Sequence, residues 1–399
     1  MKDKKKPIIS NISSLFASTS EQTHPFSNHL LQWYDEHKRD LPWRHTDDPY
    51  VIWISETILQ QTRIEQGLDY FHRFMSKFPT YQDLAMATED EVMKMWQGLG
   101  YYSRARNLHA AAKSISGSFP KTYDEVIKLK GVGPYTAAAI CSFAYGLPYA
   151  VLDGNVYRVL GRYLGIPEEI ETSKGKKIYS EAANYLLSKN RPADFNQAIM
   201  DFGAIHCTQY SPKCDSCPLA DGCYAYSIGQ IADYPVKKKR LVPKHRYLYY
   251  IAIENRGYTY IYKRTGKGIW RNLYEYPLIE LDQVITMPEL LLREDVKALF
   301  GKDKVVDSVR VVCEDKKHLL SHQYLHANCL VVKLKSKHFG GTIDNELSSE
   351  SLHSELLKMP GLDSLYGENL RCVPVLSVSD FPLHKLMTVF QEQVKELKK

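Results

Sequence analysis

Two patterns of apolar and polar positions divide the chain. Between residues 25 and 226, apolar side chains recur every three or four positions, as in helices that bury one face. The pattern is clearest in residues 29–40, 50–63, 89–100, 135–146 and 155–165. Prolines and glycines separate these segments and mark the ends of helices. The first half of the chain is therefore predicted to be helical.

A different pattern follows residue 246. Short runs rich in tyrosine and β-branched residues are typical of strands, and they occupy residues 246–254, 259–265, 305–315 and 326–335. A helical pattern returns at residues 383–399. The segment before the strands has two prolines, a run of four basic residues and little to bury, which indicates a linker. We predict a disordered tail, an all-α domain, a linker and an α+β domain, at residues 1–24, 25–232, 233–245 and 246–399.

Length and composition agree with two soluble domains. The 399 residues are 44% hydrophobic and 25% charged, and the net charge of +6 permits a polyanionic partner without requiring one. The longest uncharged stretch, residues 134–152, is interrupted by Gly146 and Pro148, so it reads as a core helix and a turn. The N-terminus has a lysine cluster but lacks the apolar segment of a signal peptide. We expect a cytoplasmic protein that does not enter the membrane.

Four of the eight cysteines crowd into 17 residues, at Cys207, Cys214, Cys217 and Cys223. In a chain without a secretory signal, such local clustering favours a metal site over disulfides. Zinc sites more often use two C-x2-C pairs separated by a longer loop, whereas one compact loop of four thiolates suits an iron–sulfur cube. The spacing C-x6-C-x2-C-x5-C therefore favours iron–sulfur over zinc.

The segment Gly131–Ile140, "GVGPYTAAAI", places two glycines before a helix. Backbone amides at a helix N-terminus favour an anion, but the lysine of a phosphate-binding loop and the third glycine of a dinucleotide fingerprint are missing. What remains is a helix–hairpin–helix around residues 123–145, whose turn (Gly131, Val132 and Gly133) would lay bare amides against a nucleic-acid phosphate. A packed helical turn explains the same residues.

Two carboxylates stand out by position. Asp153 precedes a predicted helix by two residues, and a carboxylate there is stabilised simply by the helix dipole. Glu56 falls with Gln60 and Arg63 at the edge of an apolar helix face, which a solvated surface would explain. Neither residue alone indicates catalysis.

In combination, the motifs resemble one family. "LPWR", "SETILQQTR", "GLGYYSRARNLHAAA", "LKGVGPYTA", "VLDGNV" and the cysteine loop are similar to those of adenine DNA glycosylases of the MutY type. The resemblance covers nearly the whole chain after residue 25. It implies a helix–hairpin–helix glycosylase fold with one [4Fe–4S] cluster held by the four clustered cysteines, followed by a Nudix-like (MutT-like) domain. It also implies excision of adenine mispaired with 8-oxoguanine.

The resemblance assigns catalytic roles. Glu56 is expected to protonate adenine and later to activate water, with a pKa raised by burial, as in the two-carboxylate logic of sugar hydrolysis. Asp153 is expected to stay ionised near the sugar, with Asn155 positioning the sugar or water. Tyr135 stands where the related endonuclease three family has a lysine. Because a phenol forms no Schiff base, base excision without a strong strand-cutting step is expected.

The resemblance also assigns contacts with DNA. A flipped base leaves a gap that side chains must fill, and those implied are Gln61, Thr62, Leu99 and Tyr101, although Leu99 and Tyr101 would also suit a protein core. Arg44 and Gln197 would line the adenine pocket. In the second domain the likeness maps recognition of 8-oxoguanine onto Ser321 and His322, where Leu320 replaces the usual aromatic residue. The Nudix catalytic motif is incomplete, so we expect no pyrophosphatase activity.

The sequence therefore predicts a monomeric, nucleoid-associated DNA repair hydrolase of bacterial type. Its substrate would be double-stranded DNA with A:8-oxoguanine or A:G mispairs. Two alternatives remain open at this point. One is a related iron–sulfur glycosylase or lyase for another base. The other is a non-enzymatic DNA-binding protein that uses its cluster as a redox sensor.

Overall fold

The computed structural model describes residues 24–238, 242–300, 306–320, 322–335 and 359–397. The chain forms two compact units, each of which joins segments that are distant in sequence. The first contains residues 1–86 and 107–240, and the second contains residues 87–106 and 241–399. The expected disordered tail lies outside the described residues except for His24. The expected domain boundaries remain a prediction.

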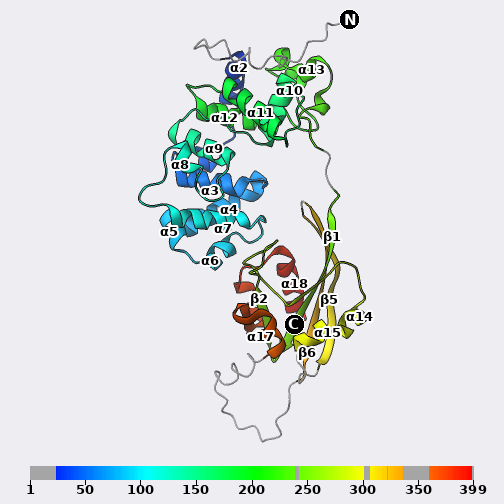
Figure 1. The fold of residues 1–399 in the computed structure, drawn as a ribbon. Helices are drawn as coiled ribbons and strands as arrows, with labels where there is room; N and C mark the ends of the chain where they lie inside the picture. Colours follow the sequence, from blue (N-terminus) through cyan, green and yellow to red (C-terminus); the bar gives the residue numbers. More distant parts are fainter. Residues whose placement is uncertain (1–23, 239–241, 301–305, 321, 336–358, 398–399) are drawn as a thin grey trace. The chain divides into compact units, whose positions relative to one another are not determined.

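The first unit is built from helices (Figure 1). They are α2 (Pro25–His37), α3 (Pro49–Leu59), α4 (Ile64–Lys77), α5 (Tyr81–Met86), the later part of α7 (Ser103–Ser114), α8 (Tyr123–Val126), α9 (Pro134–Tyr145), α10 (Gly154–Leu164), α11 (Ser173–Leu186), α12 (Pro192–Asp201) and α13 (Tyr224–Ser227). Four of these, α2, α3, α9 and α12, have a proline in the first turn, where its missing N–H needs no partner.

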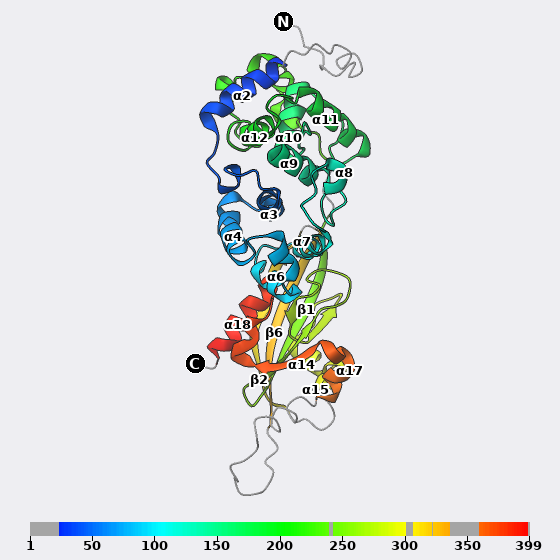
Figure 2. The same ribbon diagram turned by 90° about the vertical axis from the view of Figure 1, so that its left-hand side faces the viewer.

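Two layers of this unit matter for the site. The helices α2, α10, α11 and α12 bury a shared core that includes Leu30, Leu160, Tyr179 and Phe195. The helix α3 packs against α9, with Ile54 and Ile58 fully buried. Figure 2 shows α3 below α9, α10 and α12 within the unit. Side chains from these four helices meet at the cavity described below.

The second unit contains a mixed seven-stranded sheet in which β1 is central. Its strands are β1 (Lys244–Asn255), β2 (Tyr258–Lys263), β3 (Tyr274–Glu275), β4 (Leu278–Leu281), β5 (Val306–Leu319), β6 (Gln323–Leu334) and β7 (Leu370–Pro374). The order β3-β2-β1-β6-β5 is antiparallel except for the parallel pair β1–β6. Its helices are α14 (Met287–Leu292), α15 (Glu294–Phe300), α17 (Pro360–Tyr366) and α18 (Lys385–Glu396). An α+β arrangement was expected from the sequence, and it is confirmed.

The helix α6 (Glu89–Met95) belongs to this second unit. Lys263 on β2 forms an ion pair of 2.6 Å with Asp90 on α6. The backbone N–H of Leu383 donates to Gln97 Oε1 at 3.1 Å, just beyond the end of α6. The sequence pattern grouped this helix with the first half of the chain, because periodicity does not report long-range contacts.

The predicted helix at residues 50–63 is shorter in the structure. The helix α3 ends at Leu59, and a turn separates it from α4 at Ile64. Gln61 has a φ of 57°, a left-handed conformation that no α-helix can continue. The prediction of one continuous helix was therefore wrong at its C-terminal end. Residues 60–63 are all polar, but Gln60 and Arg63 continue the helical spacing from Glu56, so the pattern does not mark the end of the helix.

Candidate active site

Glu56 lies inside the unit rather than on a solvated face. Asp48 caps α3 by accepting a hydrogen bond from the Tyr50 N–H at 2.8 Å, and this fixes where the helix begins. From that start, Glu56 turns inward and is only 7% exposed. A buried carboxylate without a counter-ion is unstable, so its partners decide its charge.

The Tyr135 hydroxyl donates to Glu56 Oε2 at 2.6 Å. Burial, with a smaller contribution from the nearby Asp153 carboxylate, raises the pKa of Glu56 to about 7. The hydrogen bond from Tyr135 and the positive charge of Arg44 act in the opposite direction. A carboxyl group with this pKa carries a proton for much of the time at neutral pH. It is therefore able to give and take a proton under cellular conditions.

Asp153 is the N-cap of α10, as the simplest interpretation of the sequence predicted. Its Oδ1 accepts from the Val156 N–H at 2.7 Å, and its Oδ2 accepts from Asn155 Nδ2 at 2.7 Å. The pKa of Asp153 lies above its ordinary value because burial outweighs these hydrogen bonds, which lower it. Unlike Glu56, Asp153 has donors directed at both oxygens, which favour the charged form. The cap and a charged role at a reaction centre are therefore compatible.

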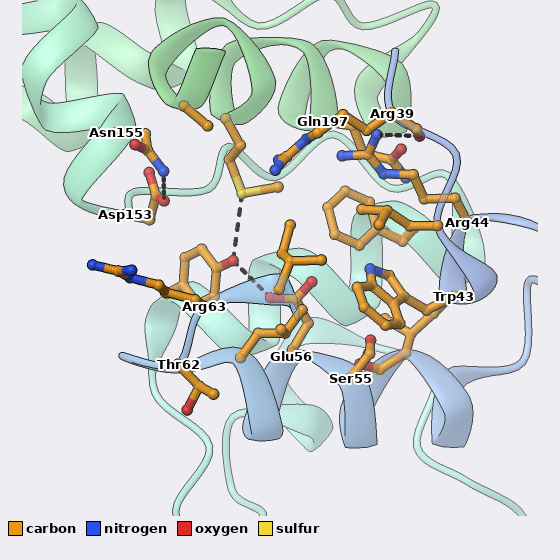
Figure 3. A pocket seen from close by; sticks show the side chains of 18 of the residues that line it. Arg39, Trp43, Arg44, Ser55, Glu56, Thr62, Arg63, Asp153, Asn155 and Gln197 are labelled. Carbon is orange, nitrogen blue, oxygen red and sulfur yellow. Dashed lines mark hydrogen bonds between the residues drawn. The ribbon is translucent and has the colours of Figure 1, made fainter. Parts of the chain in front are cut away.

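Both carboxylates line one cavity of about 490 Å³ (Figure 3). This volume lies within the range of roughly 300–1,000 Å³ typical of ligand sites. The sequence-predicted residues that line it are Arg44, Glu56, Thr62, Tyr135, Asp153, Asn155 and Gln197. They come from α3, α9, α10, α12 and neighbouring turns, so the fold brings together residues as distant in sequence as Arg44 and Gln197. Gln61, by contrast, is exposed on the turn after α3.

The upper wall of the cavity in Figure 3 is a buried charge cluster. Arg44 donates two hydrogen bonds of 2.8 Å to Asp201, one to each carboxylate oxygen. Arg39 also pairs with Asp201, which is fully buried. These two guanidinium groups hold the pKa of Asp201 below its usual range against the effect of burial. Sequence reasoning found Arg44 but missed Arg39 and Asp201, since single charged residues in an amphipathic pattern carry no pairing signal.

Arg158 connects two regions that the sequence treated separately. Its guanidinium donates to the Asn155 Oδ1 at 2.8 Å and to the Cys207 carbonyl oxygen at 2.8 Å. Asn155 in turn donates to Asp153. The first cysteine of the loop is thus linked through one side chain to the residue that holds Asp153.

The glycine turn has the conformation that the sequence predicted. Gly131 has a φ of 83°, and a Cβ there would lie 2.6 Å from the Cβ of Asn107, so no other residue fits without movement. Val132 is buried, and Gly133 is the N-cap of α9 without a side-chain cap. The first amides of α9 therefore lack a side-chain acceptor, as a phosphate-binding turn requires.

Three further predicted residues lie in the second unit. Leu99 is buried, as the packing interpretation holds, whereas Tyr101 on the same loop is 49% exposed and has a φ of 46°. His322 follows β5 at an exposed turn, and Leu320 N–H donates to the Gln323 carbonyl oxygen across it. Ser321 lies outside the described residues.

The four clustered cysteines all lie in the segment that follows α12. Burial, with smaller contributions from Cys207, Cys223 and Cys214, raises the pKa of the Cys217 thiol to about 12. Arg162 Nη1 lies 3.4 Å from the Cys207 Sγ. Within the described ranges, no three His, Cys, Asp or Glu side chains are arranged to bind a single metal ion. Four cysteine thiolates are the donor set by which proteins hold iron–sulfur clusters, so the residue types of this loop are chemically suited to such a group.

Comparisons with known proteins agree with this geometry. Residues 54–184 match the family model of the HhH-GPD superfamily base excision DNA repair protein. The adenine DNA glycosylase of Buchnera aphidicola subsp. Baizongia pistaciae is 34% identical over 76% of this chain and 84% of its own length. The Arabidopsis thaliana adenine DNA glycosylase is 34% identical over 68% of this chain and 50% of its own length. The human one is 42% identical over 53% of this chain and 41% of its own length. In the parts of the chain that the structure describes, no helix is long and apolar enough to cross a bilayer.

These matches confirm the resemblance on which the sequence analysis relied, and they confirm a helical helix–hairpin–helix fold joined to a mixed-sheet domain. DNA is the substrate of this family, and its reaction is hydrolytic removal of a base. The chain belongs to the adenine DNA glycosylase family of helix–hairpin–helix base excision repair enzymes, and it is a DNA N-glycosylase.

Proposed function

We propose that this protein excises adenine mispaired with 8-oxoguanine or guanine, by hydrolysis of the N-glycosidic bond after the nucleotide has been flipped out of the helix. The observation that carries this proposal is the single cavity lined by Glu56, Tyr135 and Asp153. A base inside a duplex is out of reach of any such cavity, so flipping must precede the chemistry.

Glu56 acts first as a proton donor. With a pKa of about 7, it is able to protonate adenine at N7, which turns a poor leaving group into neutral adenine when the C1′–N9 bond breaks. The electron pair of that bond leaves with the base, and positive charge develops on the sugar. Tyr135, which donates to Glu56 at 2.6 Å, holds the carboxyl group in place.

Asp153 acts on the sugar. Its charged form, supported by Val156 and Asn155, stabilises the developing cation or bonds transiently to C1′. The Glu56 carboxylate then accepts a proton from water as the water oxygen bonds to C1′. The products are free adenine and an abasic site, and Glu56 has regained its proton.

The cavity also supports base removal without strong strand cleavage. Strand cutting of the lyase type requires an amine that forms a Schiff base with the sugar. Among the described residues that line the cavity, none is a lysine, and Tyr135 occupies the position where the related family has one. Arg39, Arg44 and Arg63 line the cavity, but guanidinium groups remain protonated and are not nucleophiles.

We further propose that Cys207, Cys214, Cys217 and Cys223 hold one [4Fe–4S] cluster. Bound there, the cluster would tie the loop to α10, because Arg158 and Arg162 on α10 contact the loop at Cys207. The hydrolysis itself transfers no electron. The C-terminal unit would act as a Nudix-like domain that reads 8-oxoguanine at Ser321 and His322.

A single-turnover assay tests the proposed function. Duplexes that carry A:8-oxoguanine, A:G, T:G or an oxidised pyrimidine are mixed with excess enzyme, and released bases and strand breaks are measured separately. We expect adenine release from the first two, with few breaks until the abasic site is cleaved chemically. Release of oxidised pyrimidines without adenine would refute the proposal. The variant His322→Ala should narrow the preference for A:8-oxoguanine over A:G while leaving release from A:G unchanged.

A further inference from the structure

Tyr34 lies behind the wall of the cavity, in the core between α2 and α12, and is only 3% exposed. Its hydroxyl donates to Oε1 of Gln197 at 2.7 Å. Gln197 lines the cavity, and Figure 3 shows its amide extending into it from α12. A core tyrosine is thus in direct contact with a polar group that faces the substrate site.

The chemistry of the two groups fixes which way the amide faces. A buried phenol must donate its proton, and a glutamine amide offers one acceptor, Oε1, and one N–H₂ donor. If the amide were turned over, the Tyr34 O–H would meet N–H₂ and its proton would lack this acceptor. The Arg44 guanidinium, 5.9 Å from the centre of the Tyr34 ring, supplies donors only. Among the described residues, the hydrogen bond of the Tyr34 hydroxyl is the one to Gln197 Oε1. Burial raises the pKa of Tyr34 to about 12, so the donor proton is present at every physiological pH.

We propose that Tyr34 is a positioning residue for base specificity: it holds the Gln197 amide with its N–H₂ group toward the cavity, so that the site accepts a purine whose N1 is a hydrogen-bond acceptor. This inference rests on the proposed function. Adenine has an unprotonated N1, whereas hypoxanthine, which has the same size and shape, carries a hydrogen on N1. A fixed N–H₂ group therefore favours adenine and opposes hypoxanthine.

Glu56 leaves the N1 edge of the base free for recognition. It reaches the cavity from α3, whereas Gln197 reaches it from α12 (Figure 3). A purine whose N7 meets Glu56 therefore has its six-membered ring available to a different wall. Recognition by a fixed donor discriminates more strongly than recognition by shape, because the wrong base would leave two facing donors without acceptors.

The test is the variant Tyr34→Phe, which removes one oxygen and retains the ring under Arg44. Single-turnover rates are measured on duplexes with adenine or hypoxanthine opposite 8-oxoguanine. The ratio of the adenine rate to the hypoxanthine rate is then compared with that of the wild type. We expect the ratio to fall roughly tenfold, in line with the loss of one directed base contact. Tyr50→Phe is the matched control, since it also removes a buried hydroxyl bond (to the Phe78 carbonyl oxygen, 2.8 Å) but does not contact Gln197. It should keep the wild-type ratio.

A second variant keeps the proposal open to refutation if Tyr34→Phe folds poorly. Gln197→Met replaces the amide with an apolar side chain of similar length, so it should lower the ratio of the adenine rate to the hypoxanthine rate to the same value. The double variant with Tyr34→Phe should show no further change in this ratio. An unchanged ratio in either single variant overturns the role of Tyr34. If the wild type releases no adenine from any duplex, the proposed function fails instead, so the two failures are distinguishable.

Discussion

The raised pKa of Glu56 makes a prediction about stability as well as activity. A shift from the ordinary value of 4.5 to about 7 means that the folded protein holds this proton more tightly than the unfolded chain. At about 1.4 kcal/mol for each pKa unit, ionising Glu56 in the folded state removes roughly 3 kcal/mol of stability. The protonated form contributes fully below pH 4.5, and the contribution is lost as pH rises through about 7.

The variant Glu56→Gln removes this titration and keeps the shape of the side chain. Above pH 7 it should therefore be more stable than the wild type by up to about 3 kcal/mol, and at pH 5 the difference should shrink to about 1 kcal/mol. For a unit of this size, each kcal/mol corresponds to roughly 2–4 °C in Tm. Thermal melts at pH 5 and pH 8.5 measure the difference directly.

The same variant should lose base excision by a factor on the order of 10²–10⁴, the usual contribution of a positioned acid. Loss of activity together with a gain in stability at high pH separates a catalytic group from a structural one. Glu65→Gln is the matched control, because Glu65 is an exposed carboxylate at the same cavity. An equal change in Tm at both pH values for Glu56→Gln would contradict the reasoning, since it would show that Glu56 does not titrate between them.

Three other predictions follow from single contacts. Asp153→Asn retains the cap on α10, because asparagine also accepts from the Val156 N–H, so duplex binding should persist while adenine release falls at least a hundredfold in a single-turnover assay. Gly131→Ala should destabilise the protein by about 1–3 kcal/mol in denaturant melts, through its left-handed φ and the close contact with a neighbouring side chain, and should weaken duplex binding in a titration. Cys217→Ser should remove the visible absorption and iron content of the purified protein, whereas Cys141→Ser, outside the cluster, should not; a colourless wild type that contains zinc would contradict the iron–sulfur assignment.

Local features of the site were visible in the sequence. Asp153 was expected at the start of a helix and Gly131 in the turn before one, and the structure places the first as an N-cap and the second in a left-handed conformation. The predictions for the helices were wrong only about where a helix ends and about which unit a helix packs in. The helix α3 ends before the predicted residue 63, and α6 belongs to the second unit, because neither the turn at Gln61 nor a long-range contact leaves a periodic signal.

The burial of Glu56 was beyond local reasoning from the sequence. On a helical wheel it lies at the edge of the apolar face, where a solvated position was the simplest interpretation. In the structure α9 covers that edge and brings Tyr135 to within hydrogen-bonding distance. The partners Tyr34, Asp201 and Arg158 were missed for the same reason. Each acts through a residue that is far away in the chain and leaves no motif of its own.

The contrast between Glu56 and Asp153 shows how one fold gives two carboxyl groups different hydrogen-bond donors. Glu56 receives one hydrogen bond and sits within an apolar helix face, so burial dominates and the proton is retained near neutrality. Asp153 is also buried, but its position at a helix start supplies a backbone N–H and an amide N–H₂ to its two oxygens. The proposed division of roles, with Glu56 as the acid and Asp153 as the anion, therefore rests on which donors each position in its helix supplies, and those positions follow from the helix boundaries.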